Sequence, residues 1–319
     1  MNDTQKLMPL AHPGGPYETI EEMVRGVRMP VFKQRHRSTR EVLIESARHG
    51  EKDYLVRGDQ RITYAQVIPM VASVAASFKD KYGVGSGDRV AILAANYPEW
   101  IISFWAVTSL GGVVVALNAL WVKGEVAYGI EHSEPTLLIG DQRRLDMTDS
   151  LNHGVPVINI ETEFEALLNF APGVGLPDVV IDEDDPAVML YTSGTTGRPK
   201  GALMPHRAII GFMQCQAFRG LDGYYQSTGA LPTQGPNQSS TVLNTPLFHI
   251  AGICSGILSN TSAGTKVVFS VGRFDPVKMM KMVEKEKITM ISMMGSMAPR
   301  ILALPNLADY DISSVTTVG

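Results

Sequence analysis

The sequence predicts an α/β fold with two mostly parallel sheets flanked by helices. Apolar, β-branched runs alternate along the chain with segments of helical periodicity, which is the order of βαβ units. The length of 319 residues suits about two compact units. The composition, 45% hydrophobic and 19% charged, is typical of a globular chain. A net charge of −4 without long blocks of one sign gives no reason to expect nucleic acid as a partner.

The first predicted element is a hairpin. Residues 54–57 and 61–63 alternate around the turn residues 58–60. Thr63 and Gln66 then form a capping box, the start signal of a helix that carries one apolar face. The chain is therefore expected to pass directly from a hairpin into a core-facing helix.

Alternating strands and helices follow this first helix. A strand is predicted over 90–93, a helix opens at Pro98, and a valine-rich strand covers 113–115. The alternation continues with a helix over 124–132 and strands over 136–139, 155–160 and 187–191. This pattern predicts a mostly parallel sheet covered on both faces.

Residues 100–122 carry no charge and are long enough to span a bilayer. The pair Gly111 and Gly112 divides this stretch into a helix-like half and a β-branched half. A helix, a tight turn and a buried strand explain the division better than a transmembrane helix, so we expect no transmembrane segment.

A second series begins after a loop or linker over 229–240. Strands are predicted over 266–269, 288–292 and 314–318. A helix capped by Asp275 lies between the first two, and a helix capped by Ser296 lies between the last two. Because the chain stops in a predicted strand at Gly319, we expect it to be a fragment.

The first 35 residues are expected to form an N-terminal extension, rich in Pro and Gly and then basic. Its end carries a run of cations, Arg25, Arg28, Lys33, Arg35, Arg37 and Arg40. Such runs are most often solvated surface; the alternative is docking of an anionic ligand or partner. No secretion leader is visible, and Cys215 and Cys254 lack metal or redox spacing, so we expect a cytoplasmic protein.

The motif YTSGTTGRPKG, at 191–201, carries the clearest chemical signal. Gly194 and Gly197 allow the backbone to approach a ligand closely. Four hydroxyls and two cations surround them, from Thr192, Ser193, Thr195, Thr196, Arg198 and Lys200. Clustered amides, hydroxyls and cations are suited to phosphate oxygens. Pro199 stands where the Walker pattern requires its second glycine, so a P-loop NTPase is disfavoured.

This motif resembles the phosphate-binding signature of the adenylate-forming enzymes, the superfamily of acyl-CoA synthetases, aryl-CoA ligases, peptide-synthetase adenylation domains and luciferase-like enzymes. Further resemblance covers GDRVAILAANYPEW at 87–100, LNALWVKGEVAYGIEHSEPTLLI at 117–139, PLFHIAG at 246–252 and YDISSVTTVG at 310–319. The chain looks like the N-terminal part of such an enzyme.

The resemblance implies ATP-dependent activation of a carboxylic acid to an acyl-adenylate, followed by transfer to coenzyme A, with Mg²⁺ as cofactor. The phosphates of ATP would be held by Thr192, Ser193, Gly194, Thr195, Thr196, Gly197 and Lys200. Thr192 would also be a Mg²⁺ ligand, and Lys200 and His249 would act in catalysis. Without the resemblance, a histidine beside Phe248 is more often a core residue.

The resemblance also implies a division of the chain. A first α/β subdomain would cover about 60–218, and an incomplete second one about 36–59 plus 219–319, with the family's C-terminal domain absent. Because the family's Mg²⁺-binding Glu and adenylation Lys do not occur, the isolated chain is expected to be inactive. The cut sheet edge would favour a homo-oligomer.

Three questions stay open at this stage. The acid could be fatty, aryl or short-chain, with an aliphatic or aromatic acid favoured, which would place the enzyme in fatty-acid or lipid metabolism. The acceptor could be a carrier protein instead of coenzyme A. A non-catalytic nucleotide- or acyl-binding module is the alternative of another class.

Two weaker features have other expected roles. The acidic run Asp182, Glu183, Asp184 and Asp185 lacks interleaved ligands, which disfavours a metal site. A methionine cluster would fill core rather than line an acyl pocket: Met279, Met280, Met282, Met290, Met293, Met294 and Met297.

Overall fold

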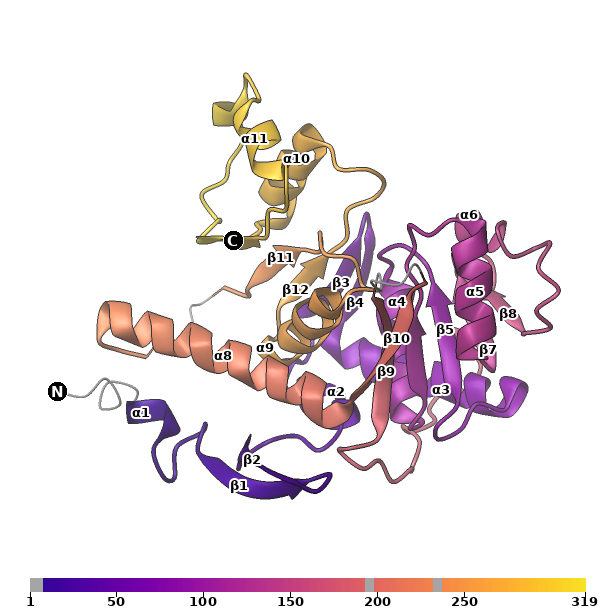
Figure 1. The fold of residues 1–319 in the computed structure, drawn as a ribbon. Helices are drawn as coiled ribbons and strands as arrows, with labels where there is room; N and C mark the ends of the chain where they lie inside the picture. The colour runs from indigo at the N-terminus through magenta and orange to yellow at the C-terminus, as the bar shows by residue number, and fades with distance from the viewer. Residues whose placement is uncertain (1–7, 193–197, 232–236) are drawn as a thin grey trace.

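A computed structural model describes residues 8–192, 198–231 and 237–319. Two six-stranded sheets lie beside one another with helices packed on them, and a two-stranded sheet lies near the N-terminus (Figure 1). The α/β class with two mostly parallel sheets is confirmed.

The first sheet has the strand order β10-β9-β6-β5-β7-β8. Its strands are β5 (Arg89–Leu93), β6 (Val113–Ala116), β7 (Leu137–Gly140), β8 (Val157–Asn159), β9 (Pro186–Thr192) and β10 (Lys200–Pro205). All neighbours are parallel except β9 and β10, which form an antiparallel pair. The carboxyl ends of five strands therefore meet at one edge of the sheet.

Helices cover both faces of this sheet. They are α3 (Tyr64–Tyr82), α4 (Pro98–Ser109), α5 (Lys123–Ser133), α6 (Gln142–Leu145) and α7 (Phe164–Leu168). Val90 and Ile92 of β5 join a core with α3 and α4, whereas Ala91 and Leu93 join a separate core with α5. This alternation is the burial expected of a strand covered on both sides.

The uncharged stretch 100–122 folds as expected from its sequence. It contains the buried helix α4, a turn at Gly111 with φ of 74°, and the buried strand β6. No helix among the described residues is long and apolar enough to cross a membrane.

The second sheet has the order β14-β13-β11-β12-β3-β4. Its strands are β3 (Asp53–Arg57), β4 (Gln60–Thr63), β11 (Ser240–Val242), β12 (Lys266–Val268), β13 (Met290–Ile291) and β14 (Thr317–Val318). Only β3 and β4 pair antiparallel. The predicted hairpin and the Thr63–Gln66 capping box are confirmed, and the expected subdomain boundary near residue 60 falls inside this hairpin.

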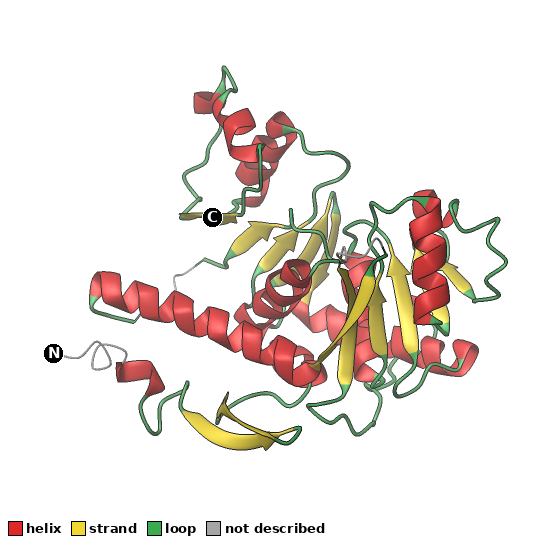
Figure 2. Cartoon of the chain, viewed as in Figure 1, coloured by secondary structure: helices red, strands yellow, loops and turns green. Residues whose placement is uncertain are grey.

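Further helical segments are α2 (Thr39–Ser46), a 3₁₀ turn (Ala47–His49), a π-helix (Gly252–Ser259), α9 (Asn260–Ala263), α10 (Pro276–Glu286), α11 (Met297–Leu302) and a 3₁₀ turn (Leu307–Asp309) (Figure 2). Of these, α10 and α11 were predicted, whereas α2 and α9 were not. The Asp275 carboxylate caps α10 by accepting from the amides of Val277 and Lys278, as predicted. Ser296 is the N-cap residue of α11, as predicted, but its side chain makes no capping hydrogen bond. The π-helix was not predicted.

The N-terminal extension is more ordered than expected, with α1 (Met8–Ala11) and the paired strands β1 (Thr19–Val24) and β2 (Val27–Phe32). Helix α8 (His206–Thr228) was also missed, although it is 23 residues long. Its second half extends away from the two large sheets (Figure 1). Tyr17 packs on Phe218 of α8, with ring centroids 5.3 Å apart, so the N-terminal segment docks along this helix.

His206, the first residue of α8, is fully buried, and its Nδ1 accepts a hydrogen bond of 3.1 Å from the backbone amide of Thr39. Burial lowers the pKa of His206 to about 4, from 6.5. Between about pH 6.5 and about pH 4 the unfolded chain therefore binds a proton that the folded chain does not bind.

We expect the free energy of unfolding to fall by about 1.4 kcal/mol from about pH 7 to about pH 5.5 because of this histidine. Denaturant titrations at the two pH values should show the loss. His206→Asn keeps an acceptor for the Thr39 amide but does not titrate, so its unfolding free energy should fall less over the same range. Equal slopes in the two proteins would contradict this role.

Candidate active site

The motif 191–201 begins in the last residues of β9 and ends in the first residues of β10, which pair antiparallel. Thr192 pairs with Lys200, and Tyr191 pairs with Gly201. The Thr192 hydroxyl lies 3.5 Å from the Lys200 carbonyl oxygen, and both side chains are exposed. The structure thus brings Thr192 and Lys200 together at the carboxyl end of β9. The other expected ligands lie outside the described residues: Ser193, Gly194, Thr195, Thr196 and Gly197.

His249 lies between β11 and the π-helix. Its amide donates to the Pro246 carbonyl at 3.1 Å, and its carbonyl accepts from Ile253 in the first helical turn. The side chain is exposed, so the core alternative considered for this histidine is wrong. It does not line the cleft described next, and neither do Thr192 and Lys200.

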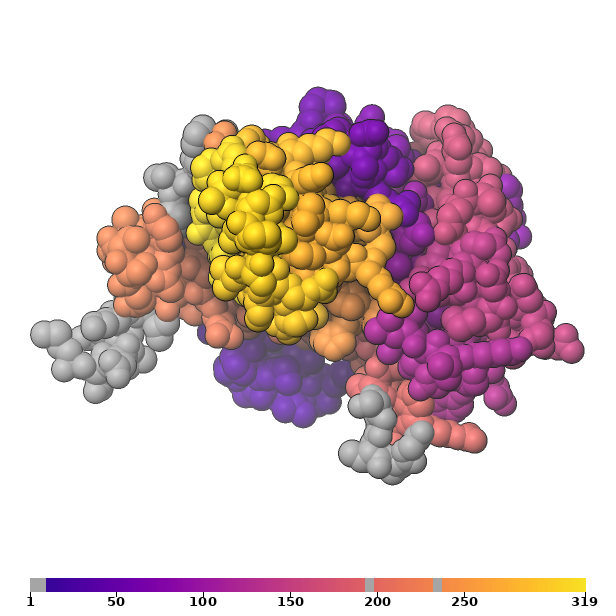
Figure 3. All heavy atoms as spheres, turned by 90° about the horizontal axis from the view of Figure 1, so that it is seen from above, coloured from indigo at the N-terminus to yellow at the C-terminus, as the bar shows by residue number. Residues whose placement is uncertain are grey.

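A cleft of about 830 Å³ lies between the two large sheets. The first sheet contributes the segments that follow β5, β6, β7 and β8, and the second contributes those that follow β11 and β12 together with the end of β3. Figure 3 views the molecule from above, with C-terminal residues in yellow and orange and first-sheet residues in magenta. Crevices outside the carboxyl ends of parallel strands are the usual ligand sites of α/β folds.

Arginines give this cleft positive charge. The Arg57 guanidinium lies 4.1 Å from the centre of the Tyr97 ring, and the Tyr97 hydroxyl donates to Glu161 at 3.0 Å. Burial and the Glu161 carboxylate raise the pKa of Tyr97, which keeps this hydroxyl protonated. Arg143 and Arg273 are exposed and form no ion pair with any described residue.

Asp141 and Arg144 fix the shape of the cleft wall. Their side chains pair at 2.6 Å, and the Asp141 carboxylate also accepts from the backbone amide of Ala95 at 2.8 Å. Arg144 donates to the Ala119 carbonyl at 2.9 Å. This buried pair therefore links the segments that follow β5, β6 and β7.

These cleft residues were not predicted from the sequence. A signal was present, because Asp141, Arg143 and Arg144 come directly after a buried apolar strand, where parallel strands present ligand-binding residues. Of the methionine cluster, Met279 and Met280 are core as expected, whereas Met297 lines the cleft and Met294 is 46% exposed.

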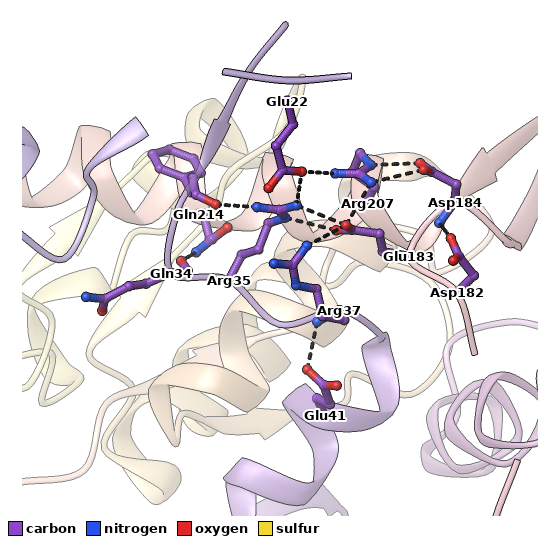
Figure 4. Close-up of polar contacts among 11 residues, drawn as sticks. Glu22, Gln34, Arg35, Arg37, Glu41, Asp182, Glu183, Asp184, Arg207 and Gln214 are labelled. Atoms are coloured by element: carbon purple, nitrogen blue, oxygen red, sulfur yellow. Dashed lines mark hydrogen bonds and ion pairs between the residues drawn. The ribbon is translucent and has the colours of Figure 1, made fainter. Parts of the chain in front are cut away.

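The basic run is not solvated surface at Arg35, and this expectation is wrong there. The Arg35 side chain is 4% exposed. It donates to both oxygens of Glu183 at 2.9 Å and to Glu22 at 2.6 Å (Figure 4). Arg40 also binds other parts of the chain, since its guanidinium donates to the carbonyls of Pro177 and Val179 at 2.7 Å.

The acidic run supplies the partners of these arginines. Glu183 also binds Arg37 at 2.5 Å and Arg207 at 2.7 Å, and Arg207 holds Asp184 through two hydrogen bonds of 2.7 and 2.9 Å (Figure 4). Burial raises the pKa of Glu183, but hydrogen bonds from Arg35 and Arg37 outweigh it, so the net pKa is lowered. We call Glu22, Arg35, Arg37, Glu183, Asp184 and Arg207 the ionic cluster.

The model of the AMP-binding enzyme family matches residues 43–319. The chain belongs to the AMP-binding enzyme family. The resemblance to adenylate-forming enzymes is thereby confirmed, and both the 191–201 motif and PLFHIAG lie in the matched range. Glu22, Arg35 and Arg37 precede it, so the ionic cluster joins an N-terminal segment to the family domain.

Curated relatives of this AMP-binding chain are CoA ligases. It is 29% identical over 268 residues to 4-coumarate--CoA ligase CCL1 of Humulus lupulus, covering 81% of this chain and 47% of that protein. It is 27% identical to the putative acyl-CoA synthetase YngI of Bacillus subtilis, covering 84% and 52%. The chain thus spans about half the length of the curated relatives it matches.

Solved structures share the fold. The inhibitor-bound N-terminal domain of FACL13 from Mycobacterium tuberculosis matches with a TM-score of 0.76 and 21% identity, covering 89% of this chain and 69% of that one. The o-succinylbenzoate CoA synthetase of Bacillus subtilis, in complex with its acyl-adenylate intermediate, matches with a TM-score of 0.70 and 24% identity, covering 89% and 68%.

Proposed function

We propose that the AMP-binding chain is the N-terminal part of an ATP-dependent acid–CoA ligase. A substrate carboxylate attacks the α-phosphorus of ATP and releases pyrophosphate, and the thiol of coenzyme A then attacks the acyl carbon and releases AMP. The observation that carries the proposal is the hydroxyl- and cation-rich motif 191–201, whose described ends pair Thr192 with Lys200, in a chain whose relatives are CoA ligases.

In this proposal the 192–197 segment and Lys200 bind the β- and γ-phosphates. Lys200 is exposed at the first residue of β10, so its ammonium can neutralise the departing pyrophosphate. The exposed Thr192 hydroxyl is a hard oxygen donor, which suits Mg²⁺, an ion that takes its other ligands from phosphates and water. Mg²⁺ would supply further neutralisation of the phosphate charge.

The cleft supports coenzyme A as the acceptor. Arg143 and Arg273 present guanidinium groups that pair with no described residue, and guanidinium binds phosphate well. We propose that they receive the phosphates of coenzyme A, which a carrier protein does not expose as a free nucleotide. The acid would be fatty or aryl, because Phe248 beside His249 is apolar.

Lys200→Ala is expected to weaken Mg²⁺-ATP binding about tenfold, the size of one lost charge-assisted hydrogen bond. Titration calorimetry on the 319-residue chain measures this directly. Lys278→Ala, which removes an exposed lysine of α10, is the matched control and should bind like the unmodified chain.

Three results would separate the alternatives. If the unmodified chain does not bind Mg²⁺-ATP, the ligase proposal fails. Binding of ATP without coenzyme A would favour a carrier-protein acceptor. Because the chain spans about half of its relatives, we also propose that it does not complete the reaction alone; AMP release from ATP, acid and coenzyme A would refute that part.

A further inference from the structure

Three consecutive residues after β5 join the two large sheets. The Ala95 amide donates to the Asp141 carboxylate at 2.8 Å, and the Tyr97 hydroxyl donates to Glu161 at 3.0 Å. Asp141 and Glu161 follow β7 and β8, so both of these bonds stay within the first sheet. The residue between them, Asn96, bonds to the second sheet instead.

Asn96 uses its whole side-chain amide on the segment that follows β11. Its nitrogen donates to the Leu243 carbonyl at 3.3 Å and to the Thr245 carbonyl at 2.9 Å, and its oxygen accepts from the Leu247 amide at 2.9 Å. Two acceptors and one donor admit a single orientation of the amide. Among the described residues that line the cleft, Asn96 is the only one whose side chain hydrogen-bonds across it.

Tyr97 supplies a second contact with the second sheet. The Arg57 guanidinium, at the end of β3, lies 4.1 Å from the centre of the Tyr97 ring. In the second sheet β12 lies between β11 and β3 (Figure 1). Asn96 and Tyr97 therefore hold the second sheet on both sides of β12, and the segment that follows β12, which includes Arg273, lines the cleft.

Other contacts of the 243–247 segment leave its distance from the first sheet less defined. The Leu243 amide donates to the Val268 carbonyl at 2.9 Å, which fixes the segment within the second sheet alone. Leu243 and Leu247 share an apolar core with Val90 of β5. Apolar packing has no direction, whereas hydrogen bonds restrict both distance and angle. The three Asn96 bonds are therefore the contacts that define how closely the two sides of the cleft approach.

We propose that Asn96 is a positioning residue that sets the width of the cleft, so that Arg143 on the first-sheet wall and Arg273 on the second-sheet wall bind phosphates of one ligand. Arg143 follows β7 and Arg273 follows β12, so their separation depends on how the two sheets are held. A ligand that contacts both walls gains from a fixed separation, because the walls do not have to be ordered on binding. The inference rests on the proposed function for coenzyme A as that ligand.

Distances between spin labels test the role of Asn96 without any ligand. Leu120 and Val271 are 77% and 57% exposed and lie on opposite walls, so Leu120→Cys and Val271→Cys carry the labels, and Cys215→Ser removes the exposed native thiol. Asn96→Ala should shift the measured distances to longer values. Asn96→Asp should shift them further, because carboxylate oxygens would face two carbonyl oxygens.

Gln238→Ala and Gln238→Glu are the matched controls. The Gln238 side chain also donates to two backbone carbonyls, those of Asp53 at 2.6 Å and Gly264 at 2.9 Å, but none of these three residues lines the cleft. The control variants lose the same kind of bonds, so they should be destabilised to a similar degree while the label distances stay those of the unmodified chain. An equal shift in the Gln238 variants would show general loosening of the fold and would overturn the inference.

Titration calorimetry with coenzyme A, on chains without labels, tests the consequence for binding. Asn96→Ala should weaken coenzyme A binding about tenfold, and Gln238→Ala should leave it unchanged. Should Asn96→Asp fail to fold, Asn96→Ala carries the same comparison, because alanine places no charge against the carbonyls.

The two measurements separate this inference from the proposed function. Unchanged label distances in the Asn96 variants would overturn the inference even if the affinity for coenzyme A falls. Unchanged affinity despite longer distances would also overturn it, because the width of the cleft would then not matter to the ligand. If the unmodified chain does not bind coenzyme A while the distances shift as expected, the coenzyme A part of the proposed function fails and the positioning role of Asn96 stands.

Discussion

Arg35→Met is expected to lower the free energy of unfolding by about 3 kcal/mol. Methionine keeps the aliphatic bulk of the side chain, so the decrease in the free energy of unfolding is due to removal of the guanidinium. The Arg35 side chain is 4% exposed. Its guanidinium donates to Glu22 of the N-terminal hairpin, to the backbone carbonyl of Phe32 and to Glu183. Removing it leaves Glu22 with only the more distant Arg207, at 3.5 Å, among the described cations, and takes one of three arginines from Glu183, whose side chain is 11% exposed.

Arg37→Met provides the matched control. Arg37 binds the same carboxylate, Glu183, but its side chain is 48% exposed. Exposed pairs contribute about 0–1 kcal/mol, so this variant should remain within 1 kcal/mol of the unmodified chain. Denaturant titration of both variants gives the comparison. Equal losses would show that burial of Arg35 does not decide the energy of the ionic cluster.

Local signals were sufficient for most of the fold. The Thr63–Gln66 capping box, the Asp275 cap and the apolar strand runs each act within a few residues, and the structure contains the elements they predicted. Helix α8 gave no such signal, because its glycines and its exposed second half leave little apolar periodicity.

Long-range pairing explains why the basic run was expected to be solvated surface although Arg35 is buried. Arg35 and Glu183 are 148 positions apart, so neither sequence neighbourhood indicates the other. Each run alone resembles a solvated charged surface. Together they form a partly buried cluster that joins the N-terminal segment to the family domain.

The candidate site also has one part that local sequence predicts and one part that depends on long-range contacts. The phosphate motif is contiguous, so its composition alone was enough to predict phosphate binding, which stays a prediction; the structure adds the pairing of Thr192 with Lys200. The cleft instead combines the ends of strands from both sheets, and Arg57 meets Tyr97 only because of the order of the strands. Sequence patterns predict where strands are but not which loops face one another across a crevice.

Gly252 lies where the PLFHIAG segment turns back on itself. A Cβ at this position would lie 2.0 Å from the Pro246 carbonyl oxygen and 2.8 Å from the Leu247 Cα. Both are backbone atoms, and the Asn96 side chain further holds this turn by accepting from the Leu247 amide at 2.9 Å. Pro246 and Phe248 line the cleft, so this contact couples the start of the π-helix to the shape of the candidate site.

Gly252→Ala should therefore destabilise the chain by about 3 kcal/mol, although alanine by itself favours a helix by about 1 kcal/mol. Two other glycines serve as controls in the same denaturant titrations. At Gly256 a Cβ would lie 2.9 Å from the end of the Leu243 side chain and 3.7 Å from the end of the Leu247 side chain, both of which are flexible, and Gly256→Ala should cost less than about 1 kcal/mol. At Gly211 in α8 nothing lies within 4 Å, and Gly211→Ala should stabilise by roughly 0.5–1 kcal/mol.

Because Pro246 has to move in Gly252→Ala, coenzyme A binding should weaken in that variant and remain unchanged in Gly211→Ala. Equal stability of the Gly252 and Gly256 variants would show that the 246–252 turn yields to the added methyl group, and the coupling between this turn and the cleft would be refuted.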